Sequence, residues 1–586
     1  MKSIFPLIPI KLIFLAATIY IWKQLFKHGA EKQQTKAAKM MLAAGILSVI
    51  LSVISVGKIY PYGVAVDLLI FAAATTIFMT LPKSNFPLRL LATLVLAIPV
   101  MGPLAYLLHY IVVGGAMNKD SFIAVYQTTG NEAFEYLSTF TSVISILPIL
   151  ALLVLLAWIG KQEGKTSRTL PTKVALKLVA MCVFFIALAP IEKGLFTYPV
   201  KVYASYIEEI QSSKERLASF DARDIKKSYT AAKDEKGEVY VVIVGESLNK
   251  HHMGVYGYPL DTTPELGKIQ QQDNLFISAN SYSNYPGTMA ALSYALTEAN
   301  QKNQKTYLES VGVVEVLNDA GFNTHWLGNQ PLSNSYDMIL GLIAKEAQDV
   351  QLTFDIKFHS MSHKNHKPDG VLLPLYTDKL KQLDDQQSHV IFVHLMGNHT
   401  NYCERYPEEY KRYEVSALDA AWLHIFKGGL GHSRECYDNS VLYNDFVVSE
   451  IITQLKQSLG EQGVGAVLYF ADHSEDIKRG VGHSTANFSY DMVESPAIMW
   501  LSQGYKQQYA EKASTLAENQ NAFFPNDFIF DTVLGMTNTR VSGDIYCEQC
   551  DLFNSNYRLP AEEATTLHGK KPYIPVKEGF SLSSAD

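Results

Sequence analysis

The chain is poor in cysteine, and it has no cluster of basic residues of the kind that binds nucleic acid. Its 586 residues include five cysteines and carry a formal net charge of −7. Nucleic-acid binding needs a basic patch or stripe, so this class of partner is disfavoured. Internal repeats and low-complexity tracts are also missing, which excludes a repeat architecture. A chain of this length is too long for one domain.

Four of the five cysteines fall in the polar second part of the chain: Cys403, Cys436, Cys547 and Cys550. An even number of cysteines there fits two disulfides formed in an oxidising compartment. The Cys-Glu-Gln-Cys spacing at 547–550 also fits half of a zinc knuckle or a redox pair. A second C-x-x-C is missing, which disfavours a metal at this place.

Long apolar runs dominate the chain up to about residue 190. Six of them approach the length that crosses a bilayer: 5–22, 40–57, 63–81, 90–113, 142–160 and 174–190. No signal-peptide cleavage site precedes the first, so we expect it to remain as a span. Residues 1–195 are therefore predicted to form a helical transmembrane domain, with six spans or with five spans and one interfacial helix.

The loops after the first, third and fifth apolar runs are the basic ones. The positive-inside rule places these loops in the cytoplasm. Everything after residue 190 then faces the other side, which is the periplasm of a Gram-negative cell. Residues 196–237 mix aromatic and charged side chains, which fits a helix lying on the membrane surface or, equally, a solvated linker helix.

Residues 238–586 are predicted to form one α/β domain, because short strand-like runs alternate with helical patterns. Four such runs precede polar motifs: Val239–Val244, Asn323–Leu327, His389–Leu395 and Ala466–Phe470. This alternation is typical of a mainly parallel sheet, in which ligands bind beyond the carboxyl ends of the strands.

Those strand ends place four chemically active side chains at one edge of the sheet: Glu246, His399, Asp472 and His473. Carboxylates and imidazoles that converge predict a zinc-type metal site. Each residue also has a plain structural alternative. Glu246 could cap the next helix, and Asp472 could be an N-cap beside a surface histidine.

Thr288 is the candidate nucleophile. It precedes a helical pattern over 288–299, and a helix N-terminus favours a phosphate group. A threonine hydroxyl becomes a good nucleophile when a metal lowers its pKa. The alternative is an ordinary N-cap threonine, and Ser247 and Ser474 are rival hydroxyls beside the proposed ligands.

The remaining histidines divide into two groups. His399 and His483 are candidates to bind a phosphate oxygen, protonate a leaving group or hold a second metal. His251 and His252 are expected on the surface. The histidines of the basic stretch 359–367 are expected to face an anionic surface rather than a metal.

Several strings resemble the phosphoethanolamine transferases, which are inner-membrane enzymes with an alkaline-phosphatase-like (sulfatase-like) periplasmic domain. They are Val-Ile-Val-Gly-Glu246-Ser-Leu-Asn, His394-Leu-Met-Gly-Asn-His399, Tyr437-Asp-Asn-Ser-Val-Leu-Tyr-Asn-Asp445 and Asp472-His-Ser-Glu475. The similarity runs from about residue 115 to beyond residue 535, with the motifs in order. Ser474 departs from the family, which usually has glycine there, and the first apolar run is one more than usual.

The resemblance implies a reaction and roles for the site residues. One or two zinc ions would be held by Glu246, Thr288, Asp472 and His473, and His399 and His483 would contact phosphate or a second zinc. Thr288 would carry phosphoethanolamine from phosphatidylethanolamine to lipopolysaccharide. The lipid A branch of the family usually has cysteines around its threonine, and this chain has none around Thr288. The resemblance is therefore closer to the branch that modifies core heptose. The expected protein is a monomer among membrane lipids.

Two other kinds of function stay open. One is another enzyme on the same scaffold, a phosphoglycerol transferase or a phosphodiesterase; a sulfatase would need a C/S-x-P-x-R motif, which Thr288 does not begin. The other is a non-catalytic membrane sensor that keeps the fold, although retention of every proposed ligand argues against it.

Overall fold

The computed structural model describes residues 7–28, 38–47, 61–81, 86–113, 170–188 and most of 229–576, with scattered residues elsewhere. Within 229–576, the stretches outside the described residues are 273–274, 308–309, 331–337, 354–366, 427–432, 481 and 484–486. The chain divides into two compact units. One comprises Met1–Thr128 and Thr141–Ser212, and the other comprises Thr129–Phe140 and Ser213–Asp586.

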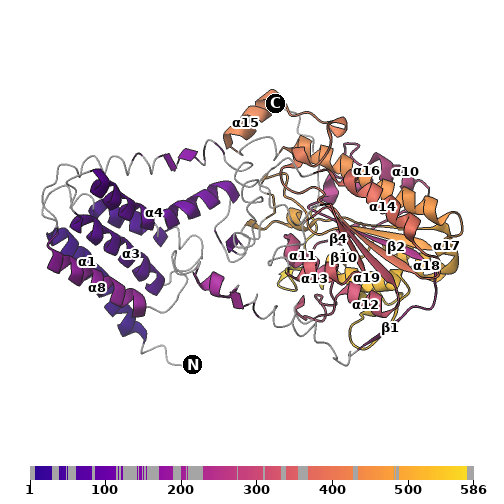
Figure 1. Ribbon diagram of the computed structural model, residues 1–586, viewed down its shortest axis with the longest axis horizontal. Coiled ribbons are helices and arrows are strands. Elements are labelled where there is room, and N and C mark those ends of the chain that lie inside the picture. The colour runs from indigo at the N-terminus through magenta and orange to yellow at the C-terminus, as the bar shows by residue number, and fades with distance from the viewer. Residues whose placement is uncertain are drawn as a thin grey trace. The chain divides into compact units, whose positions relative to one another are not determined.

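The first unit is built from long apolar helices (Figure 1). They are α1 (Leu7–His28), α3 (Pro61–Thr80), α4 (Phe86–Val113) and α8 (Thr172–Leu188). Helix α3 packs against the other three, and Leu69 and Phe71 are fully buried there. Among the described residues, Tyr62–Thr80 is the helix long and apolar enough to cross a membrane, with a mean hydropathy of 1.9.

The helices of this unit match four of the predicted apolar runs in position. Residues 40–47 of the run 40–57 are helical, whereas most of its remainder, most of the run 142–160 and most of the predicted interfacial segment 196–237 lie outside the described residues. The number of spans and the bounds of the three predicted domains therefore stay predictions.

The second unit is an α/β domain around a seven-stranded sheet of order β3-β9-β8-β2-β7-β5-β6. Its strands are β2 (Val239–Gly245), β3 (Leu275–Ile277), β5 (Asn323–Gly328), β6 (Asp349–Leu352), β7 (His389–His394), β8 (Gly465–Ala471) and β9 (Ala497–Leu501). The four predicted strands are β2, β5, β7 and β8, and each pairs in parallel with its neighbours among them. Strand β9 runs antiparallel to both β8 and β3. The fold prediction is confirmed as a mainly parallel sheet with one antiparallel strand.

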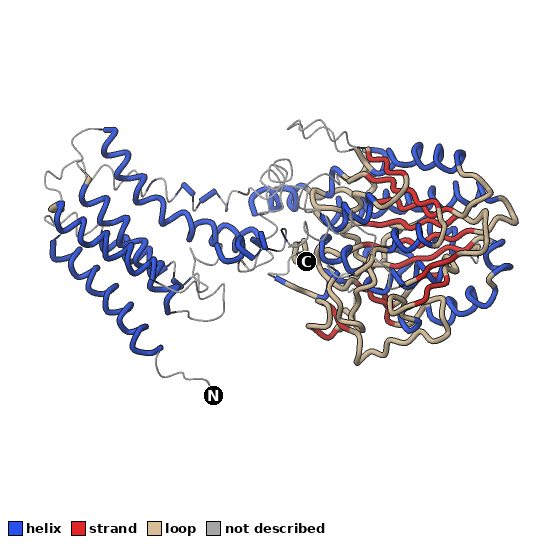
Figure 2. Tube along the Cα trace, turned by 60° about the horizontal axis from the view of Figure 1, so that its bottom comes forward, coloured by secondary structure: helices blue, strands red, loops and turns tan. Residues whose placement is uncertain are grey.

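Strand β2 forms the middle of this domain because it is buried on both faces, as expected of a Val/Ile-rich parallel strand. Val242 and Val244 point into one core and Val241 and Ile243 into the other. Helices cover both faces, as Figures 1 and 2 show. One layer contains α10 (Pro264–Gln270), α14 (Leu372–Gln382) and α16 (Arg434–Leu459), and the opposite layer contains α12 (Val313–Asp319), α13 (Met338–Lys345), α17 (Gln503–Gln508), α18 (Ala510–Asn519) and α19 (Ile529–Met536).

Smaller elements complete the domain. Helix α11 (Thr288–Ala295) follows β4 (Asn280–Tyr282), and α15 (Ala417–Phe426) precedes α16. Three two-stranded sheets pair β4 with β10 (Phe523–Pro525), β1 (Thr230–Ala232) with β11 (Arg540–Ser542), and β12 (Thr565–Thr566) with β13 (Lys571–Pro572).

The four cysteines of the polar part form two disulfides, Cys403–Cys436 and Cys547–Cys550. The expectation of two disulfides is confirmed. Because both sulfurs of the C-x-x-C pair are bonded to each other, the zinc-knuckle alternative does not hold in this structure. Cys182 is a free thiol buried in α8.

Candidate active site

Glu246 follows the last residue of β2, where the chain makes a sharp turn. A Cβ on Gly245 would lie 2.7 Å from the Tyr469 hydroxyl, so only glycine fits there. Ser247 adopts the left-handed conformation with φ 57°, and its hydroxyl donates to Glu246 Oε1 at 2.8 Å. The following short helix is capped by the side chain of Asn249. Glu246 is therefore not a helix cap, and its carboxylate stays at the carboxyl end of the sheet.

Asp472 and His473 leave the neighbouring strand β8 beside Glu246. Asp472 Oδ1 accepts the backbone N–H groups of Ser247 at 3.0 Å and His473 at 2.6 Å. The His473 Nδ1 atom lies 3.0 Å from the Ser474 carbonyl oxygen, so Nδ1 carries a proton and Nε2 faces the carboxylates. That Nε2 lies 3.3 Å from both Glu246 Oε1 and Asp472 Oδ2.

These three side chains form a compact, buried group. One ligand atom of each lies within 4.8 Å of the other two. Neither Asp472 nor His473 is exposed at all, so the alternative of a surface histidine is wrong.

Thr288 brings a hydroxyl to the same group. It is the first residue of α11, and Gly287 occupies the N-cap position without a side-chain cap. The N-cap alternative for Thr288 is therefore wrong. Its Oγ1 lies 3.3 and 3.4 Å from the two carboxylate oxygens of Glu246 and 3.2 Å from His473 Nε2. Of the two rival hydroxyls, Ser474 Oγ is buried without a hydrogen-bond partner among the described residues. The Ser247 hydroxyl donates a hydrogen bond to Glu246.

The electrostatics of the group favour a cation. Burial, together with the charge of Glu246, raises the pKa of Asp472 well above its usual value. For Glu246 burial acts in the same direction, but the hydrogen bond and charge of His473 outweigh it and hold the pKa well below the usual value. Two carboxylates this close cannot both stay charged without a positive partner. Carboxylate oxygens, an imidazole nitrogen and a hydroxyl in a tight buried group are a donor set that fits zinc.

His483 and His399 border this group. His483 Nδ1 lies 2.8 Å from the buried Glu475 Oε1, and its ring centre is 4.1 Å from that of His473. The ring centres of His399 and His483 are 6.5 Å apart. Burial alone would raise the pKa of Glu475, but the charge of His483 outweighs it and lowers that pKa. The structure thus brings all six predicted site residues to one place, while their chemical roles stay predictions.

Residues 238–539 match the sulfatase family. The chain belongs to the sulfatase family. It is also similar to the phosphoethanolamine transferases EptC of Escherichia coli strain K12 and CptA of Salmonella typhimurium strain LT2. Each is 27% identical to it, and the match covers 73% of this chain and 77% of the relative.

Two solved structures share the fold of this sulfatase-family chain. The integral membrane lipooligosaccharide phosphoethanolamine transferase A of Neisseria meningitidis superposes with a TM-score of 0.57 at 18% identity, covering 88% of this chain and 98% of that one. The periplasmic domain of E. coli EptC in complex with Zn superposes with a TM-score of 0.50 at 22% identity, covering 59% of this chain and 94% of that one.

Sequence reasoning missed Asp369, a buried carboxylate that holds the loop leading to His399. Asp369 accepts the backbone N–H groups of Met396 and Gly397, each at 2.8 Å, and the Asn329 amide at 2.8 Å. Gly397 has φ 52°, and a Cβ there would lie 2.7 Å from the Glu246 carbonyl oxygen. The loop therefore lies directly against the Glu246 backbone. No local pattern marks Asp369, because the groups it binds are distant in sequence.

Asn526 was missed for the same reason. Its amide donates to the Asp472 carbonyl oxygen at 2.6 Å and its side-chain oxygen accepts the Asn284 N–H at 2.7 Å. Ser283 Oγ also donates to that carbonyl, at 2.5 Å. These bonds connect the segment before Thr288 to the strand end that carries Asp472.

Some expectations about other residues were wrong or lie outside the described residues. His252 is buried and its Nδ1 lies 2.7 Å from Asp438 Oδ1, while His251 contacts the buried Glu494. The surface position predicted for these two histidines is wrong for His252. Both histidines act as structural residues. His359, His363 and His366 lie outside the described residues.

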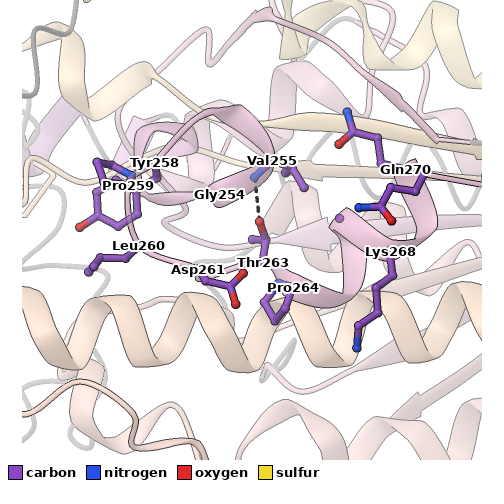
Figure 3. Close-up of a pocket in the computed structure, with 12 residues that line it drawn as sticks. Gly254, Val255, Tyr258, Pro259, Leu260, Asp261, Thr263, Pro264, Lys268 and Gln270 are labelled. Atoms are coloured by element: carbon purple, nitrogen blue, oxygen red, sulfur yellow. Dashed lines mark hydrogen bonds between the residues drawn. The ribbon is translucent and has the colours of Figure 1, made fainter.

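A hollow of about 530 Å³ lies between the loop that follows β2 and helix α10 (Figure 3). Its wall is closed by a hydrogen bond from the Val255 N–H to Thr263 Oγ1 at 2.9 Å. None of the six predicted site residues lines it. The candidate active site is therefore the buried group around Glu246 and does not include this hollow.

Proposed function

We propose that this protein is a zinc-dependent phosphoethanolamine transferase that moves phosphoethanolamine from phosphatidylethanolamine to lipopolysaccharide. The observation that carries the proposal is the Thr288 hydroxyl at 3.2 to 3.4 Å from His473 and Glu246. Similarity to EptC and CptA supports the transferred group. A sulfatase reaction is not supported, since Thr288 does not begin a C/S-x-P-x-R motif.

Glu246, Asp472, His473 and Thr288 would hold the metal. The Zn-bound EptC domain, which shares the fold, supports this choice of ion. When bound, zinc lowers the pKa of a coordinated hydroxyl and stabilises negative charge on phosphoryl oxygens. Two ions would need further ligands, for which His399 and His483 are the candidates.

The chain's own residues carry the first step. As the alkoxide, Thr288 Oγ1 attacks the phosphorus of phosphatidylethanolamine, a bond between that oxygen and phosphorus forms, and the bond from phosphorus to the diacylglycerol oxygen breaks. The N-terminus of α11 faces the phosphoryl group, where backbone N–H groups and the helix dipole favour its charge. His483, held through Nδ1 by Glu475, gives a proton from Nε2 to the leaving diacylglycerol oxygen.

The second step reverses these roles. An acceptor hydroxyl or phosphate oxygen loses its proton to His483 or His399 and attacks the phosphorus, and the bond to Thr288 Oγ1 breaks. We propose the core heptose as acceptor before a lipid A phosphate, because cysteines are missing around Thr288. The protein would act as a monomer in the bacterial inner membrane. Residues 1–195 would span the bilayer, 196–237 would lie at its surface, and 238–586 would form the periplasmic catalytic domain.

The test uses the full chain in detergent with phosphatidylethanolamine or phosphatidylglycerol as the donor. We expect diacylglycerol release from phosphatidylethanolamine only, and a phosphoethanolamine mass on the peptide that contains Thr288. Release from phosphatidylglycerol instead would replace the proposal with phosphoglycerol transfer.

Thr288→Ala tests the proposed nucleophile directly. It should lose the covalent adduct and reduce transfer by at least about 10³-fold. The melting temperature should stay close to that of the wild type, because Thr288 caps no helix. Zinc content should be largely kept, because Glu246, Asp472 and His473 would still hold the ion. Transfer at the wild-type rate in this variant would refute the covalent mechanism.

A further inference from the structure

Helix α15 carries an exposed apolar stripe that the catalytic reaction does not use. Leu418, Trp422 and Ile425 are 80%, 49% and 44% exposed. Their spacing of four and three residues places them on one face of the helix. Ala420 and Leu423, on the opposite side, are less exposed. The stripe therefore points away from the domain, and Figure 1 shows α15 projecting from the domain's edge.

The segment that contains α15 is anchored beside the loop that carries His399. The segment that contains α15 is closed at its base by the disulfide between Cys403 and Cys436. Cys403 lies four residues after His399 in the sequence. The Asn398 amide also donates to Ser440 Oγ of α16 at 2.7 Å. Both ends of the segment are thus fixed near the loop that carries His399.

The size of the stripe limits what can cover it. Three side chains on a ten-residue helix bury far less than the roughly 800 Å² that each partner contributes to a stable protein complex. A second copy of the chain would not be held by so small a surface. A bilayer surface needs less contact energy, because an apolar helix such as α3 keeps the domain at high local concentration near the lipid. Tryptophan with aliphatic neighbours on one face of a short helix is typical of an interfacial segment.

We propose that α15 is a membrane-contact helix, whose Leu418–Trp422–Ile425 stripe inserts into the lipid interface beside the active site. The contact orients the carboxyl edge of the sheet toward the bilayer. A lipid donor then reaches Thr288 without leaving the membrane surface. This last consequence depends on the proposed transferase activity, whereas the contact itself does not.

The test places an environment-sensitive fluorophore on the full chain in lipid nanodiscs. Leu418→Cys labels the stripe and His424→Cys labels an exposed position of the same helix outside it, both in a Cys182→Ala background. We expect lipids with a shallow spin label to quench the fluorophore at 418 at least threefold more than at 424. Aqueous iodide should show the reverse order.

Each other outcome overturns the proposal. Equal quenching at the two positions, with full iodide access, would mean that the stripe stays in water. Protection of position 418 from both quenchers would mean that protein covers it, either the chain's own helical unit or a second copy. Because neither readout needs turnover, the contact is tested separately from the transferase activity.

A functional arm uses the double variant Leu418→Ser/Ile425→Ser. We expect the KM for long-chain phosphatidylethanolamine in nanodiscs to rise at least fivefold, while turnover of a soluble short-chain donor stays unchanged. Equal loss with both donors would show that the stripe acts through folding of the site, which contradicts membrane contact.

Discussion

Asp369 gives the sharpest test of how the site is built, because its contribution can be worked out from its contacts. Its carboxylate is buried and accepts two backbone N–H groups and one side-chain amide, all at 2.8 Å. Asp369→Ala leaves the two backbone donors of Met396 and Gly397 without an acceptor. Each buried unsatisfied group costs about 1–3 kcal/mol, which gives a gross loss of about 2–6 kcal/mol.

A second effect reduces this loss. Burial raises the pKa of Asp369, although the hydrogen bonds it accepts oppose the shift. Removing the carboxylate therefore also removes part of the free-energy cost of burying a charge. We expect the net loss of unfolding free energy to be about 2–3 kcal/mol. Asp369→Asn keeps one acceptor oxygen but turns an amide donor toward a backbone N–H, so it should lose about 1–2 kcal/mol.

The assay is urea unfolding of the full chain in detergent, followed by the fluorescence of tryptophan residues such as the buried Trp326. Asp378→Ala is the matched control, since its exposed carboxylate pairs only with Lys381 and should change stability by less than about 0.5 kcal/mol. Zinc affinity should fall in Asp369→Ala alone, because Gly397 lies against the Glu246 backbone. The reasoning is refuted if Asp369→Ala unfolds at the same urea concentration as Asp378→Ala.

Two further predictions concern stability. Replacing Cys403 and Cys436 by serine opens a loop with a sequence separation of 33 residues and should lower the free energy of unfolding by about 3–4 kcal/mol. The same change at Cys547 and Cys550, with a separation of three, should lower it by roughly half as much. Equal losses for the two variants in urea unfolding would contradict the argument from loop length. Burial would raise the pKa of Glu494, but the charge of Lys250 outweighs this effect and lowers the pKa from 4.5 to about 2. The Glu494 carboxylate therefore stabilises the fold above pH 4.5, and this stabilisation is lost as the pH falls toward 2. Between pH 5 and 2.5 the free energy of unfolding of the Glu494→Gln variant should fall by about 2 kcal/mol less than that of the wild type. Parallel declines would show that other groups cause the acid sensitivity.

The central sheet could be predicted because its strands carry the signal in their own residues. Strand β2 is a run of Val and Ile buried on both faces, and such runs are strand-like wherever they pack. Strands β3 and β6, of three and four residues, are too short to give a pattern. Strand β9 lies antiparallel in the same sheet, and its direction depends on the turns that lead into it rather than on its own residues.

The sequence predicted the site residues that directly follow strands. It did not predict the residues that hold the neighbouring loops in place. Glu246 and Asp472 are recognisable because each comes directly after a buried strand. Asp369 and Asn526 act through hydrogen bonds to backbone groups of distant segments, and such bonds leave no spacing pattern in the sequence. His252 shows the same limit, since its partner Asp438 is 186 residues away and sequence alone indicated a surface residue.

The positions of the proposed nucleophile and the proposed ligands are coupled through one carbonyl group. Strands β2 and β8 fix Glu246 and Asp472 by direct pairing, but Thr288 comes from α11, outside the sheet. Ser283 and Asn526 both donate to the Asp472 carbonyl oxygen, at 2.5 and 2.6 Å, and Asn526 also accepts from the segment before Thr288. A displacement of that segment would therefore break bonds at the strand end that carries Asp472. The hydroxyl and the carboxylates thus move together, as in-line transfer at a single phosphorus atom requires.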